Sequence, residues 1–153
     1  MLETAVKVNR RLVREYRRQR EIGSCIVGRD AETCLRNARN RLRWERLEAC
    51  GLVRLQAEPE QENYFDVHGE PDDERERAEI VRQIELNGCW CVAGQYRTEP
   101  DGEWEWADSV GMCIYDHPLS DAENCYIPDI ISTTIDALKT ALRSRCPVCR
   151  KPR

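Results

Sequence analysis

Hydrophobic residues recur with the period of an α-helix along the first third of the chain. Ala5, Val8, Leu12 and Tyr16 are three or four positions apart, and arginines occupy another face of the same stretch. This spacing predicts an amphipathic helix that is broken by the segment between Gly23 and Gly28.

A second helical stripe follows these glycines and is the clearest local pattern in the chain. Its apolar members are Ala31, Leu35, Ala38, Leu42 and Ala49. Asp30 is placed to cap the N-terminus of this helix, and Gly51 is placed to close its C-terminus. Residues 52–57 are then predicted to form a short strand.

An acidic connection, residues 58–74, separates this strand from a third predicted helix. At 17 residues it is longer than most connections in compact domains, which indicates a functional or a mobile segment. The helix is expected to start near Pro71, a favourable residue for a first turn, and to end at Gly88. Its apolar face is Ala78, Val81 and Ile84.

From Cys89 the apolar period changes to two, which predicts a β-hairpin with its turn at Pro100-Asp101-Gly102. A last helix is expected after Pro128, on the spacing of Ile131, Ile135, Leu138 and Leu142. The predicted fold is therefore α+β: N-terminal helices packed with a small antiparallel sheet that contains the hairpin, and a C-terminal helix. Residues 1–144 form one domain, and residues 145–153 form a basic Cys-x-x-Cys tail.

The composition of the 153-residue chain fits a single core in a reducing compartment. It is 41% hydrophobic, and its nine cysteines are an odd number with no secretory apolar segment before them. No run approaches the roughly 18 consecutive apolar residues of a membrane helix. We therefore expect a cytoplasmic protein with reduced thiols.

Charge is strongly segregated along the chain. Residues 1–54 carry 14 Lys/Arg against 7 Asp/Glu, residues 55–140 carry 5 against 21, and residues 141–153 carry 5 against none. The overall net charge of −4 conceals this polarisation. Segregation on this scale indicates a charged partner or pairing between the two halves of the molecule.

Cys146 and Cys149 have the spacing of a zinc knuckle, and zinc is the one cofactor that the sequence suggests. Two thiolates make half a tetrahedral site. The candidates for the other two ligands are Cys89 and Cys91, or else Cys113, Cys125, His68 or His117. Free thiols in a terminal tail, or a redox dithiol, are the alternatives.

His68-Gly69-Glu70, taken with the terminal cysteine pair, resembles the signature of zinc nucleobase deaminases, in which His and two Cys hold zinc while Glu moves protons. The chain departs from that signature, because Arg145 stands where a proline precedes the first cysteine. The cysteine pair also closes the chain instead of opening a helix. A zinc-dependent deaminase or hydrolase is thus the third interpretation of function.

Two charged surfaces are candidates for binding. Arg36, Arg39, Arg43 and Arg46, here called the Arg ridge, are spaced to lie on one helix face and would neutralise phosphates of a nucleic acid, unless they form a solvated face. The acidic block, residues 55–140, has three interpretations. It forms ordinary solvated surface, it pairs with the arginines of the same molecule, or it binds a basic surface of a partner protein. The residues expected to contact such a partner are Glu62, Asp66, Glu70, Asp72, Asp73, Glu103, Trp104, Glu105, Trp106 and Asp108.

Residues 52–55, 87–97, 102–104 and 108–112 resemble a group of small uncharacterised proteins of bacteriophages and related mobile elements, over residues 52–142. The resemblance implies a phage product that acts in the host cytoplasm, and it assigns no chemistry. We therefore expect a non-enzymatic binding protein that inhibits a host defence protein, as an anti-CRISPR protein does, by presenting an acidic face to a basic surface. A zinc-stabilised nucleic-acid-binding protein that uses the Arg ridge is the alternative.

Overall fold

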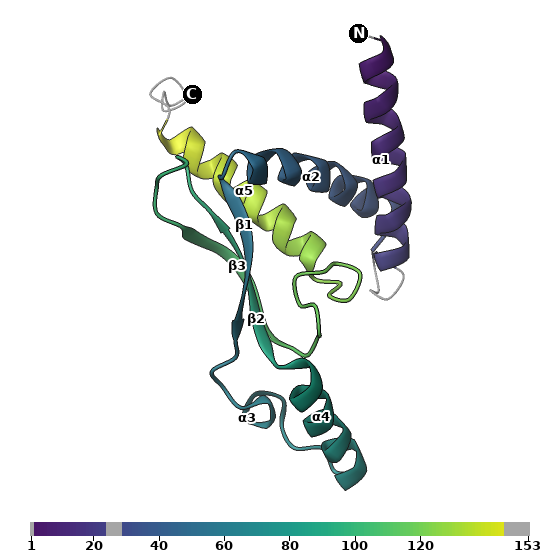
Figure 1. Ribbon diagram of the computed structural model, residues 1–153, viewed down its shortest axis with the longest axis vertical. Coiled ribbons are helices and arrows are strands. Elements are labelled where there is room, and N and C mark those ends of the chain that lie inside the picture. The colour runs from purple at the N-terminus through teal and green to yellow at the C-terminus, as the bar shows by residue number, and fades with distance from the viewer. Residues whose placement is uncertain (1, 24–28, 146–153) are drawn as a thin grey trace.

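The computed structural model describes residues 2–23 and 29–145, and all structural statements concern these. The elements in chain order are α1 (Leu2–Gly23), α2 (Ala31–Ala49), β1 (Val53–Pro59), α3 (Tyr64–His68), α4 (Glu74–Asn87), β2 (Trp90–Tyr96), β3 (Glu105–Cys113) and α5 (Ile127–Arg145). The strands form one antiparallel sheet in the order β1-β2-β3 (Figure 1). This confirms the predicted α+β class, with the hairpin formed by β2 and β3 and a C-terminal helix.

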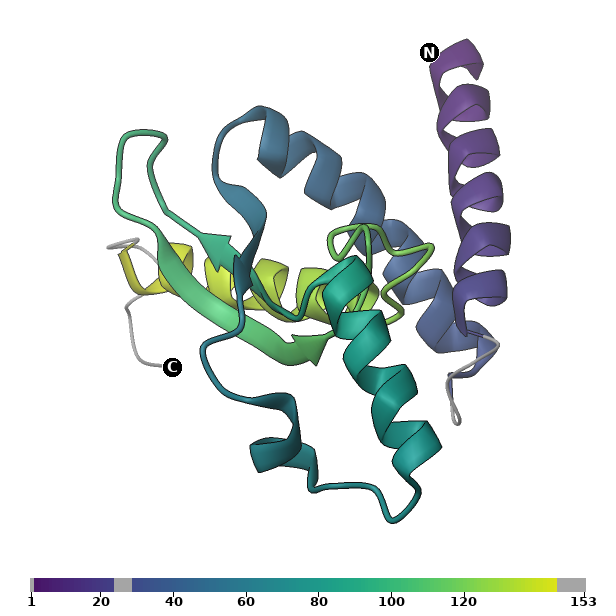
Figure 2. The same cartoon turned by 60° about the horizontal axis from the view of Figure 1, so that its bottom comes forward.

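The helices form successive layers on the sheet. Helix α5 packs on β2 and β3, α2 packs on α5 and β1, and α1 packs on α2 (Figures 1 and 2). The core lies where α5 and α2 meet the sheet. Its buried side chains are Trp44, Val53, Val92, Cys113, Ile127, Ile130, Ile131, Ile135 and Leu138.

Helix α5 lies very close to the sheet at Gly94 in β2. A Cβ atom added to Gly94 would lie 2.0 Å from Thr134 Oγ1 and 2.7 Å from Ile130 Cγ2, both on α5. The Thr134 hydroxyl is buried but satisfied, because it donates a hydrogen bond to the carbonyl of Ile130 at 2.7 Å. Glycine at position 94 therefore allows α5 to lie directly on the sheet.

The helix boundaries confirm the local sequence signals. Asp30 caps α2 by accepting a hydrogen bond from the Thr33 amide at 2.8 Å. Gly51 and Gly88 follow α2 and α4 with φ of 71° and 78°, a region that favours glycine.

Other boundaries differ from prediction because side-chain caps set them. The acidic connection contains a short helix, α3, that was not predicted, and it starts where Asn63 accepts a hydrogen bond from the Phe65 amide at 2.9 Å. Helix α4 starts at Glu74 instead of near Pro71, because Asp73 accepts a hydrogen bond from the Arg75 amide at 2.8 Å.

We expect Gly94→Ala to lower the free energy of unfolding by about 1–3 kcal/mol, because the new methyl group would push α5 from the sheet. Gly111→Ala is the control, since its Cβ would meet the Glu60 carboxylate oxygen at 2.8 Å, at the end of a flexible side chain whose shift would weaken the hydrogen bond from the Met112 amide at 3.2 Å but move no helix. Chemical denaturation of both variants measures the difference. Equal destabilisation would show that the contact at Gly94 is not tight.

Candidate interaction surfaces

The segment between β1 and β2 forms an arm that projects from the sheet. We call residues 60–88, which include α3 and α4, the α3–α4 arm. It extends from the end of the sheet that lies away from α1 and α2 (Figures 1 and 2). The arm contains 10 Asp/Glu and 3 Arg, a net charge of −7, so it concentrates much of the negative charge of the molecule.

The arm is locally well ordered by polar contacts. Arg77 donates a hydrogen bond to Glu70 at 2.6 Å, and its guanidinium lies 4.9 Å from the centre of the Phe65 ring. Phe65 in turn meets Tyr64 edge to face, with ring centres 5.6 Å apart. On α4, Arg82 makes two hydrogen bonds to Glu79 and Gln83 makes another, and together they lower the pKa of that carboxyl to about 2.

The arm nevertheless has no core of its own. Neither α3 nor α4 contains a buried residue. Ile80, Val81 and Ile84 are only half-buried, while Val67 and Leu86 are 49% and 64% exposed. A capped helix therefore presents apolar side chains that nothing in the described part of the chain covers fully.

The structure divides the acidic residues of the predicted partner site between two places. Glu62, Asp66, Glu70, Asp72 and Asp73 lie on the arm, whereas Glu103, Glu105 and Asp108 lie on the hairpin. Several carboxylates already have intramolecular partners: Glu70 binds Arg77, Asp73 caps α4, and Glu105 accepts a hydrogen bond from the Tyr96 hydroxyl at 2.9 Å. Glu62, Asp66 and Asp72 make no hydrogen bond or ion pair through their side chains within residues 2–23 and 29–145.

The two hairpin tryptophans have different surroundings. Trp104 lies just before β3 between two guanidinium groups, 4.3 Å from that of Arg54 and 4.2 Å from that of Arg97. Arg97 also donates to the carbonyl of Gly51 at 2.6 Å, so this stack ties the hairpin to the end of α2. Trp106 is 52% exposed and is the tryptophan that remains available to a partner.

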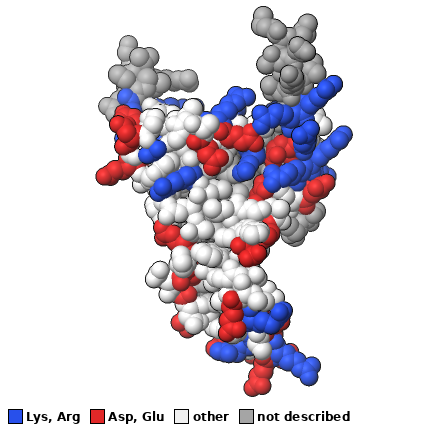
Figure 3. Space-filling model, viewed as in Figure 1, with Lys and Arg blue, Asp and Glu red and all other residues white. Residues whose placement is uncertain are grey.

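The Arg ridge is exposed, as a binding role requires. All four of its side chains lie on the surface of α2, and none forms an ion pair with a described residue. Lys139 of α5 lines the same polar groove as Arg36 and Arg43, and Asp129 and Asp136 of α5 line it as well. Figure 3 shows further basic side chains over α1. This arrangement suits phosphates or carboxylates of a partner equally well.

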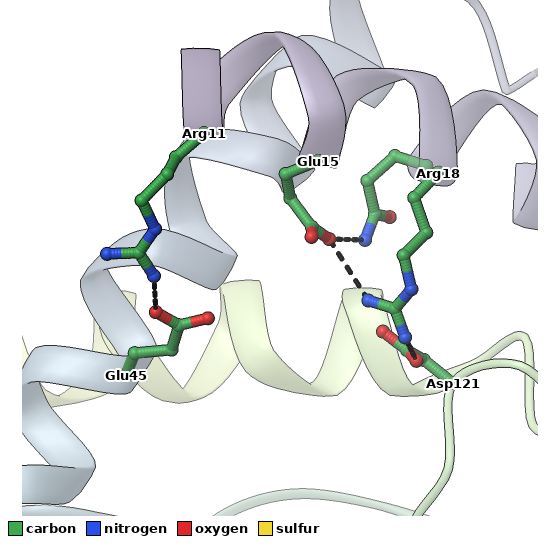
Figure 4. A network of polar contacts seen from close by, with 6 residues as sticks. Arg11, Glu15, Arg18, Glu45 and Asp121 are labelled. Atoms are coloured by element: carbon green, nitrogen blue, oxygen red, sulfur yellow. Dashed lines mark hydrogen bonds and ion pairs between the residues drawn. The ribbon is translucent and has the colours of Figure 1, made fainter. Parts of the chain in front are cut away.

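Internal pairing between the two charged halves is limited. Figure 4 shows how α1 is held: Arg11 pairs with Glu45 of α2, and Arg18 contacts Glu15 and the buried Asp121. Of the ion pairs that described residues of the basic half form, those of Arg18 with Asp121 and of Arg29 with Asp129, at 2.7 Å, cross to the acidic half. Neither involves the arm, whose charge is therefore not neutralised by α1 or α2.

The predicted zinc ligands are only partly placed. Cys146 and Cys149 lie outside the described residues, and within those residues no three or more His, Cys, Asp and Glu side chains are grouped to hold a metal. Burial, with a contribution from Glu60, raises the pKa of the Cys89 and Cys91 thiols. His68 stacks on Tyr64 with ring centres 4.6 Å apart, and Glu70 is engaged by Arg77. Zinc binding and deaminase chemistry stay predictions.

Comparison with known proteins gives no functional assignment. No protein-family model, curated protein or solved structure matches the chain. The resemblance to phage proteins therefore stays a prediction, and the surfaces of the molecule are the guide to its function. No helix in the described part of the chain combines the length and the apolar character needed to cross a membrane.

The structure predicts opposite behaviour for the two tryptophans. Trp104→Ala should lower the free energy of unfolding by about 1–3 kcal/mol, because it removes two guanidinium contacts and leaves Arg54 and Arg97 without their shared ring. Trp106→Ala should change it by less than about 0.5 kcal/mol, because that ring is half exposed. Thermal and chemical denaturation test both values, and equal losses would contradict the stacking role of Trp104.

Proposed function

We propose that the protein is a binding protein that docks on a basic surface of another protein through the α3–α4 arm. The observation that carries this proposal is a capped 14-residue helix, α4, with no buried residue. Isolated helices of this length are marginal in water, and helices in proteins gain most of their stability from packing of an apolar face. A partner that covers the arm would supply that packing.

The arm combines the two features that association requires. Its net charge of −7 attracts a basic surface and speeds encounter. Its exposed apolar side chains, Val67 and Leu86, provide area whose burial slows dissociation. Glu103, Glu105, Trp106 and Asp108 lie on the hairpin, away from the arm, and the proposal assigns them no part in the primary contact.

The biological role that we propose follows from the phage resemblance. A basic groove that binds nucleic acid presents Lys and Arg side chains, and an acidic protein element that occupies the groove competes for the same groups. The protein would then inhibit a host defence protein without chemistry of its own. Binding by the arm is the physical core of this proposal, and it holds whatever the identity of the host protein.

Charge reversal on the arm tests the proposal. Glu62→Lys, Asp72→Lys and Glu85→Lys together change exposed side chains, so the fold should be kept. The triple variant should associate more slowly with a partner recovered from the host, and its association should depend less on salt, because steering acts on the on-rate. Leu86→Ala should instead speed dissociation.

The matched control reverses three exposed acidic residues of the hairpin loop, Glu99, Asp101 and Glu103, to Lys. The control has the same net charge as the arm variant, so a general charge effect would slow both equally. Surface plasmon resonance at two salt concentrations separates the rates. If the arm variant binds normally and the control variant loses binding, the interface lies on the hairpin and not on the arm.

A further inference from the structure

The basic helices enclose two apolar hollows on the molecule. The first, of about 410 Å³, is lined by Leu12, Val13 and Tyr16 of α1 and by Ala31, Glu32 and Leu35 of α2. The second, of about 230 Å³, lies between α2 and α5. Its apolar lining is Leu47, Ile135, Leu138 and Leu142. Val13 and Leu142 are 49% and 43% exposed, so each hollow presents apolar surface to solvent.

Cationic side chains connect the two hollows along α2. Starting from Leu35 in the first hollow, Arg39, Arg43 and Arg46 follow at spacings of four, four and three residues, which keeps them on one side of the helix. Arg43 and Arg46 line the second hollow, together with Lys139 of α5. The two hollows and the exposed arginines between them make up a surface with apolar ends and a cationic centre, which we call the α1–α2–α5 groove.

This combination favours an amphipathic acidic helix as the occupant. A nucleic acid would use the cations through its phosphates and would leave both apolar hollows unfilled. An acidic helix uses both features, because its carboxylates meet the arginines while its apolar side chains enter the hollows. Within the described residues, α4 presents exposed Leu86 beside Glu85. Helix α4 itself carries four Glu against three Arg, and residues 60–73 of the same arm add six Asp/Glu and no Lys or Arg.

We propose that the α1–α2–α5 groove of one molecule binds the α3–α4 arm of a second copy; this inference rests on the binding role proposed for the arm. The lengths match: Leu35 to Leu47 spans about 18 Å, and the 14 residues of α4 span about 21 Å, at about 1.5 Å per residue. The charges match as well, because residues 10–49 carry 12 Arg against 6 Asp/Glu, opposite the arm's net −7.

The contact joins different surfaces of two molecules. In Figure 1 the arm lies at the opposite end of the molecule from α1 and α2, so the arm does not reach its own groove. An arm-to-groove contact is heterologous, and each molecule retains one free arm or groove after pairing. Such contacts form closed rings or open chains.

Sedimentation velocity on the full chain tests this assembly. The wild-type protein should form oligomers that grow with protein concentration at about 50 mM salt and dissociate at about 500 mM salt, because ionic attraction is screened. Two variants should each be monomeric: Glu85→Gln with Leu86→Asn on the arm, and Arg39→Gln with Arg46→Gln in the groove. Trp106→Ser, outside both surfaces, should assemble as the wild type does.

Mixing the two monomeric variants gives the decisive result. The groove of the arm variant and the arm of the groove variant are both intact, so the mixture should form a one-to-one dimer and nothing larger. Circular dichroism confirms that each variant is folded before mixing. A monomeric wild type at low salt, or a mixture that stays monomeric, would overturn the assembly.

The outcomes also separate this inference from the proposed function. If the wild type is monomeric but still binds a host protein through its arm, the self-assembly proposal is wrong and the proposed binding function stands. A wild type that neither assembles nor binds a partner removes both. If the wild type is monomeric and binds a fluorescent oligonucleotide that the groove variant does not bind, the groove is a nucleic-acid site, and the proposed occupant is wrong.

Discussion

The close contact between α5 and β2 at Gly94 is the constraint on which the rest of the molecule depends. Because position 94 has no side chain, Ile130 and Thr134 lie against the strand itself. The position of α5 then fixes α2, since Ser132 accepts a hydrogen bond from Asn40 at 2.9 Å and donates one to Asn37 at 3.3 Å. Helix α2 in turn carries α1, so the basic groove is set by the same contact.

The sheet fixes the positions of the two ends of the arm. Strands β1 and β2 pair from Val53–Tyr96 to Pro59–Trp90, and the Glu60 amide continues the pairing by donating to the Cys89 carbonyl at 2.9 Å. The two ends of the arm are thereby held side by side, while the arm itself gains no buried residue. The molecule thus has a rigid centre with a basic groove on one side of it and an acidic arm on the other. The arm and the groove carry opposite charges that pair little within one molecule. This is the basis of the proposed assembly, in which the arm of one copy binds the groove of another.

Local signals in the sequence predicted much of the fold and less of the surfaces. Asp30, Gly51 and Gly88 act through residues within one turn of themselves, so their roles as caps and helix ends were readable from the chain. Helix α3 was missed because five residues are too few for an apolar period, and its start depends on one side-chain hydrogen bond from Asn63. The stacking of Trp104 between Arg54 and Arg97 joins residues from separate strands and loops, which spacing does not reveal. The two hollows require the positions of α1, α2 and α5 together, and the sequence alone showed only the Arg ridge that lies between them.

The proposed function requires that α4 is a formed helix without a core, which the sheet holds out for contact with another protein. Amide hydrogen exchange measured by mass spectrometry as a function of protein concentration tests it most directly. At low concentration, peptides from α4 should exchange far faster than peptides from α5, whose residues Ile130, Ile131 and Ile135 are buried. As concentration rises at low salt, α4 should become protected while α5 stays unchanged. Protection of α4 equal to that of α5 in dilute protein would contradict the account, because it would mean that the arm already packs within a single molecule.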